Sequence, residues 1–73
     1  MSKASADKMD RDIGALIRER RYRKKMSQPD LAEALGVSSM AVQHYETGRS
    51  SLTVVKLVQI AEALGCRTKD LMP

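Results

Sequence analysis

The sequence has very few aromatic residues and only one cysteine. Neither Trp nor Phe occurs among its 73 residues, and the two tyrosines are Tyr22 and Tyr45. Any hydrophobic core must therefore be built from aliphatic side chains. The single Cys66 cannot form an internal disulfide, which is consistent with a reducing compartment. His44 is the only histidine, and it has no cysteine, histidine or carboxylate partner at ligand spacing, so we expect no zinc site.

Long apolar runs are also missing. No segment approaches the length of a membrane span, and residues 1–8 lack the apolar region of a secretory signal. We therefore expect a cytoplasmic protein. The 73 residues suffice for one domain with a small core, and the 42% hydrophobic content excludes a wholly disordered chain. A net charge of +4 and a pI of about 9.6 favour a polyanionic partner.

Catalytic groups are scarce. A nucleophile–base pair would have to be Cys66 and His44, which fall on different predicted elements. Cys66 is better explained as a small apolar residue that covers a helix end. No glycine-rich phosphate loop or carboxylate cluster occurs. We therefore expect no enzymatic activity and no cofactor.

The stretch from Gln28 to Glu46 carries two short helical patterns that meet at Gly36. Ser27 is a candidate N-cap for the first, with Asp30 three residues later, as in a capping box. Gly36 follows the last apolar residue, where a left-handed backbone often ends a helix. Ser38 is the corresponding cap of the second pattern. This spacing predicts a helix-turn-helix.

The flanking segments complete an all-α domain of five helices. We expect a flexible polar tail over residues 1–8 and a folded domain over 9–73. Its helices are predicted at 10–25, 28–35 and 39–46, then from the Thr53 cap to Leu64 with a broad apolar stripe, and finally as a short helix before Pro73. Gly14 within the first helix is explicable if another backbone comes near.

A run of charge covers residues 18–25, where six of the eight residues are basic. Two interpretations remain open. The cations can form a solvated helix end, where they suit the C-terminal dipole, or part of them can face phosphates.

The predicted third helix has two different faces. At 100° per residue, Ser38, Ala41, Val42 and Tyr45 fall on the side expected to pack inward. The opposite side carries Ser39, Met40, Gln43, His44 and Thr47. That side is uncharged and, apart from Met40, able to form hydrogen bonds. Such a face is typical of a helix that contacts base edges in the major groove of DNA.

The sequence from residue 10 to 72 resembles the Cro/CI-type (Xre-like) helix-turn-helix repressors, whose domain is lambda-repressor-like. The resemblance rests on Ile13-Gly14, Ile17-Arg18, Arg21, Ser27-Gln28, Leu31-Ala32, Leu35-Gly36-Val37-Ser38, Tyr45-Glu46, Gly48-Arg49, Leu57, Ile60-Ala61 and Ala63-Leu64-Gly65. It implies a structural ion pair between Arg21 and Glu46. Gln28 opens the second helix, where its backbone N–H and side chain can meet a phosphate. The alternative is a simple first-turn residue, and the Ser27-Gln28 match to the family favours the phosphate contact.

The candidate DNA-binding residues are Gln28, Ser38, Ser39, Met40, Gln43, His44, Thr47 and Arg49. Gln43 is the best candidate for reading adenine, and Met40 for touching a thymine methyl. His44 can donate to a phosphate or to guanine, with a solvent-exposed side chain without a partner as the alternative. Met40 is equally explicable as an ordinary surface residue. Arg49, in the loop after the third helix, is the best candidate for binding the phosphates of the DNA backbone. Ser51 and Thr47 are further candidate hydrogen-bond donors to these phosphates.

We therefore predict a transcriptional repressor that binds a two-fold symmetric operator as a homodimer, with RNA polymerase contact as an open alternative. The resemblance places the dimer surface near Leu71, Met72 and Cys66. Two other interpretations stay open. The chain could be an antitoxin or immunity-type protein with a protein partner, or the DNA-binding piece of a longer regulator.

Overall fold

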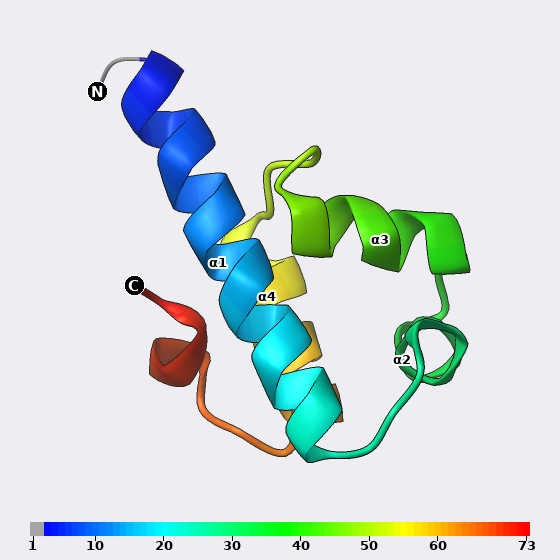
Figure 1. The fold of residues 1–73 in the computed structure, drawn as a ribbon. Coiled ribbons are helices and arrows are strands. Elements are labelled where there is room, and N and C mark those ends of the chain that lie inside the picture. Colours follow the sequence, from blue (N-terminus) through cyan, green and yellow to red (C-terminus); the bar gives the residue numbers. More distant parts are fainter. Residues whose placement is uncertain (1–2) are drawn as a thin grey trace.

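The structure, a computed structural model, describes residues 3–73, with side chains described from Asp7 onward. Within that range the elements are α1 (Lys3–Arg23), α2 (Gln28–Leu35), α3 (Ser39–Thr47), α4 (Val54–Leu64) and the 3-10 helix η1 (Thr68–Leu71). Figure 1 shows α1 as the long central rod, with α4 behind it and α3 to one side. The described part of the chain is thus all-α, as predicted.

The predicted boundaries of the first helix were wrong at both ends. Residues 3–8 continue α1 instead of forming a tail, and residues 1 and 2 lie outside the described part. Neither Pro nor Gly interrupts the chain before Gly14, and an ion pair of 2.8 Å between Lys8 and Asp12 joins successive turns of the helix. At the other end α1 stops at Arg23, because Lys25 adopts a positive φ of 56°.

The caps of the helix-turn-helix are those the sequence predicts. The Ser27 hydroxyl accepts a hydrogen bond from the Asp30 N–H at 3.0 Å, and the Asp30 carboxylate accepts one from the Ser27 N–H at 2.9 Å. Gly36 ends α2 with φ +70°. The N–H of Val37 then donates to the carbonyl of Ala32 at 3.0 Å, which closes a Schellman turn.

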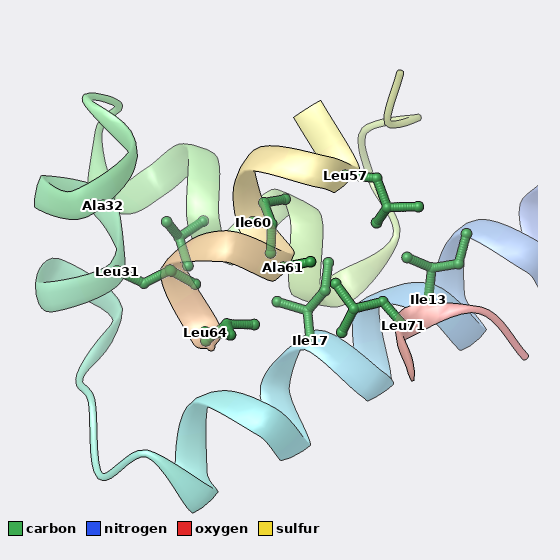
Figure 2. Close-up of a cluster of buried hydrophobic side chains, with 10 residues drawn as sticks. Ile13, Ile17, Leu31, Ala32, Leu57, Ile60, Ala61, Leu64 and Leu71 are labelled. Atoms are coloured by element: carbon green, nitrogen blue, oxygen red, sulfur yellow. The ribbon is translucent and has the colours of Figure 1, made fainter. Parts of the chain in front are cut away.

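The core is aliphatic and gathers side chains from every element. Its fully buried members are Ile17, Leu31, Val42, Ile60 and Leu71. Figure 2 shows Leu64 of α4 lying between α1 and Leu31 of α2, with Ile13 and Leu71 near one another at the far end of the cluster. α3 contributes Val42 to this core. The core therefore holds α3 by its inner face, with the residues of the outer face outside it.

Two predictions about the C-terminal half need correction. The fifth helix is only the four-residue 3-10 helix η1, so the described part has four α-helices. The predicted stripe on α4 is too broad, since Val54 is 76% exposed and Val58 is also exposed, whereas Leu57, Ile60, Ala61 and Leu64 are buried. The buried side chains of α4 thus begin at Leu57, one turn into the helix.

The predicted position of Leu71 on the dimer surface was also wrong. Its side chain is fully buried in the core, so it cannot contribute to the dimer surface for which it was predicted. Over residues 3–73, none of the helices has the length and apolar character needed to cross a membrane.

Candidate nucleic-acid interface

The outer face of α3 is open to solvent and carries no acidic side chain. Ser39, Met40, Gln43 and Thr47 are exposed, with Met40 at 59%, and His44 is half-buried. An open hollow of about 400 Å³ is lined by Met40, Gln43, His44, Thr47 and Arg49. The structure thus brings five of the predicted site residues together on one surface.

Two of the hydroxyl groups in the predicted site already have partners within the protein. The Ser38 hydroxyl accepts a hydrogen bond from the Ala41 N–H at 3.1 Å, so Ser38 caps α3. The helical periodicity of the sequence placed Ser38 on the inward side, but Ser38 is exposed. The Thr47 hydroxyl donates to the carbonyl of Gln43 at 2.9 Å. The first hydrogen bond caps the start of α3, and the second lies within its last turn.

Arg49 follows the C-terminal turn of α3. Gly48 has φ +76°, and the N–H of Arg49 donates to the carbonyl of His44 at 3.0 Å. This turn holds the exposed Arg49 at the edge of the hollow. Ser51, two residues later, donates its hydroxyl to Asp10 of α1 at 2.9 Å, so it ties the loop to α1.

Glu46 lies on the inner side of α3 and is the centre of a buried ionic cluster. Arg21 binds its carboxylate with two atoms, Nε to Oε2 at 2.6 Å and the terminal nitrogen to Oε1 at 3.0 Å. The third nitrogen of the same guanidinium donates to the carbonyl of Met26 at 2.9 Å. The structure therefore brings Arg21 and Glu46 together, and the bidentate geometry fixes α1 against the end of α3.

Two further donors reach the same carboxylate oxygen. The Gln28 amide nitrogen lies 3.1 Å from Oε1 of Glu46, and Nε of Arg18 lies 3.2 Å from it. Gln28 therefore faces the cluster with its side chain, whereas the sequence predicted a phosphate partner for it. Sequence reasoning missed Arg18 as a member. Its spacing of three residues before Arg21 puts both on one side of α1 and could have indicated it.

The cluster keeps Glu46 ionised. Burial by itself raises the pKa of Glu46, but the hydrogen bonds from Arg21, Gln28 and Arg18 outweigh that effect and leave the pKa below its usual value. The same interaction with Glu46 raises the pKa of Arg21. Among the described residues, every buried side-chain nitrogen and oxygen has a hydrogen-bond partner, so the charges are buried without an unsatisfied group.

The remaining candidate groups do not form a second site. Cys66 packs half-buried against the core, and burial raises the pKa of its thiol. In the part of the chain that the structure describes, no three His, Cys, Asp or Glu side chains come together as metal ligands would.

Comparisons with known proteins agree with this geometry. The sequence profile of the helix-turn-helix family matches residues 17–71. The HTH-type transcriptional regulator y4aM of Sinorhizobium fredii is 42% identical over 62 residues, which span 85% of this chain and 43% of that protein. The chain spans less than half the length of this relative.

Two solved structures have the same fold. The restriction-modification controller protein C.AhdI from Aeromonas hydrophila superimposes with a TM-score of 0.81 at 29% identity, covering 85% of this chain and 94% of C.AhdI. Hydroxypropylphosphonic acid epoxidase from S. wedmorenis gives 0.85 at 32% identity, but the match covers 89% of this chain and only 35% of the enzyme. The chain belongs to the Xre-like helix-turn-helix family.

Proposed function

We propose that this helix-turn-helix chain is a DNA-binding transcriptional regulator that inserts α3 into the major groove. The observation that carries the proposal is the outer face of α3, where Ser39, Gln43 and His44 present polar side chains without a carboxylate beside the exposed Arg49. A carboxylate on that face would repel phosphates, and the carboxylate of α3, Glu46, is buried on the other side. The family and relatives such as y4aM support this assignment over an enzymatic one.

The contacts are expected to divide into two kinds. Gln43 has an amide that can bind adenine N6 and N7 at once, Ser39 lies at the helix N-terminus, and Met40 can contact a thymine methyl. Arg49 and the first turn of α2 at Gln28 would hold phosphates. The phosphate contacts supply most of the affinity and its salt dependence, and the base contacts supply sequence choice.

We further propose that the protein is a repressor and binds a two-fold symmetric operator as a homodimer, with half-sites about one helical turn apart. Repression would follow from excluding RNA polymerase from the promoter. Because Leu71 is buried, the apolar side chains available for a dimer contact near the C-terminal half are Val54, Val55, Val58 and Met72. Sedimentation that finds only a monomer at every accessible concentration, alone and on DNA, would contradict the dimer.

One observation favours a second candidate. The chain corresponds to 43% of y4aM and 35% of the epoxidase. The same domain therefore occurs within longer proteins, and the alternative is that this sequence is the DNA-binding part of such a protein. The DNA-binding proposal is the same in both cases.

The direct test is selection of bound duplexes from a random pool. We expect enrichment of an inverted repeat, which reports base preference, symmetry and spacing together. If the purified protein ignores every duplex at low salt, the proposed function is wrong.

A further inference from the structure

Arg18 is the cation of the Glu46 cluster that has spare hydrogen-bonding capacity. Only its Nε contacts Glu46, at 3.2 Å, and among the described side chains no acceptor binds its two terminal nitrogens. The side chain of Arg18 is 42% exposed, whereas that of Arg21 is 7% exposed and uses all three of its nitrogens. The free end of Arg18 therefore remains available to a ligand from solvent.

The cluster also carries an excess of positive charge. Two guanidinium groups, Arg18 and Arg21, share the single carboxylate of Glu46, and Gln28 adds a neutral donor. The balance is one positive charge in a part-buried setting, where charges are less screened than in open solvent. Such a group attracts an anion, and a guanidinium presents a planar fork that suits phosphate oxygens.

The position of Arg18 is suitable for a contact with a phosphate of the same duplex that α3 would bind. Its Nε and the amide of Gln28 bind the same oxygen of Glu46, so the two side chains lie next to each other at the junction of α1, α2 and α3. Gln28 opens α2, and Glu46 belongs to the helix whose other face carries Gln43.

We infer that Arg18 is a further DNA-binding residue, which binds a backbone phosphate beside Gln28. Glu46 positions both side chains through its hydrogen bonds with them. This inference rests on the proposed function, since it assigns a further contact to the same DNA-binding surface. Arg18 would act without base preference, because a phosphate carries no sequence information.

The test compares Arg18→Gln, Arg18→Lys and a matched control, Arg20→Gln, in titrations of cognate and random duplexes over a range of salt concentrations. Arg20 lies about 200° around α1 from Arg18 and points toward η1, where its terminal nitrogen is 4.0 Å from Asp70. Both glutamine variants remove one positive charge. We expect Arg18→Gln to make the negative slope of log K against log salt shallower by about 0.9 on both duplexes. Arg18→Lys should keep most of the parent slope. Arg20→Gln should leave the slope unchanged.

Urea unfolding of each variant separates this role from a purely structural one. If Arg18→Gln lowers stability but leaves the salt slope intact, or if the two glutamine variants change the slope equally, Arg18 is not a phosphate ligand. If the parent protein binds no duplex at all, the proposed function itself fails. A normal slope for the parent together with an unchanged slope for Arg18→Gln rejects the inference alone.

Discussion

Gly14 of α1 lies directly against the backbone carbonyl of Glu46 in α3. A Cβ atom at residue 14 would lie only 2.5 Å from that carbonyl oxygen, closer than packed atoms approach. The glycine therefore lets the two helices touch through their backbones, and the side chains of Arg21 and Glu46 then meet across the same contact. The helix-turn-helix is held to α1 by this approach.

Gly14→Ala should destabilise the fold. Alanine normally improves a helix interior by about 1 kcal/mol over glycine, but here α3 must move, and overpacking of this kind costs roughly 1–3 kcal/mol. Urea unfolding measures the change. The control is Ala15→Ser, at the exposed position next along α1, which should cost less than about 0.7 kcal/mol. A Gly14→Ala protein as stable as its parent would contradict the close approach.

The Glu46 cluster predicts a loss of stability in acid. The pKa of Glu46 is lower in the folded protein than its ordinary value of 4.5, so the cluster stabilises the fold above that pH and the contribution is lost as pH falls through the folded pKa. Glu46→Gln should be less stable at pH 7 by roughly 3–5 kcal/mol, because Arg21 loses its partner. Its stability should then fall less steeply below pH 4.5.

Unfolding midpoints measured across the acid range decide this point. Glu33→Gln, which removes the same charge from an exposed site on α2, should change stability by less than about 0.5 kcal/mol. A variant Glu46→Gln with the same acid profile as the parent would show that the cluster does not govern the pH response.

Lys25 occupies a position that favours glycine. Its φ is 56°, and among residues 3–73 it is the only non-glycine residue with a positive φ. Lys25→Gly should raise stability by about 1 kcal/mol, because a left-handed conformation strains residues with a Cβ. Lys24→Gly is the matched control and should not stabilise, since its φ is not positive. Thermal unfolding compares the two, and equal effects would reject the strain argument.

Arg49→Ala should weaken binding to cognate and random duplexes alike. Arg49 is exposed at the edge of the hollow, so its proposed contact is a phosphate. The slope of log K against log salt should fall by about 0.9. Arg67→Ala, an exposed arginine before η1, serves as the control with an equal change of charge. A loss confined to one DNA sequence would instead assign Arg49 to base contact.

Local features were predictable from the residues themselves. Among tertiary features, the close backbone approach at Gly14 was expected from that glycine, and the Arg21–Glu46 pair was expected only from the family resemblance. The caps at Ser27, Ser38 and Thr53 follow from short-range chemistry and are present in the structure. Gly36 ends α2 as its position after the apolar pattern indicates. The caps and the turn depend on only a few neighbouring residues, so they can be predicted from the local sequence.

The errors arise where distant segments decide the outcome. Val54 continues the apolar pattern of α4 but is exposed in the first turn of the helix, one turn before the buried Leu57. Leu71 is buried by contacts that its own segment does not reveal. The partnership of Gln28 with Glu46 joins residues 18 positions apart, and the spacing within either helix does not indicate it.

Insertion of α3 into the major groove can be tested by comparing Gln43→Ala with the parent protein on every single base-pair variant of the selected operator. Gln43 is exposed on the outer face of α3. We predict that the variant loses roughly 1–3 kcal/mol on the cognate site and loses its preference at one base pair in each half-site, with other preferences kept. A uniform loss over all sequences, or no change, would contradict the insertion of this face into the major groove.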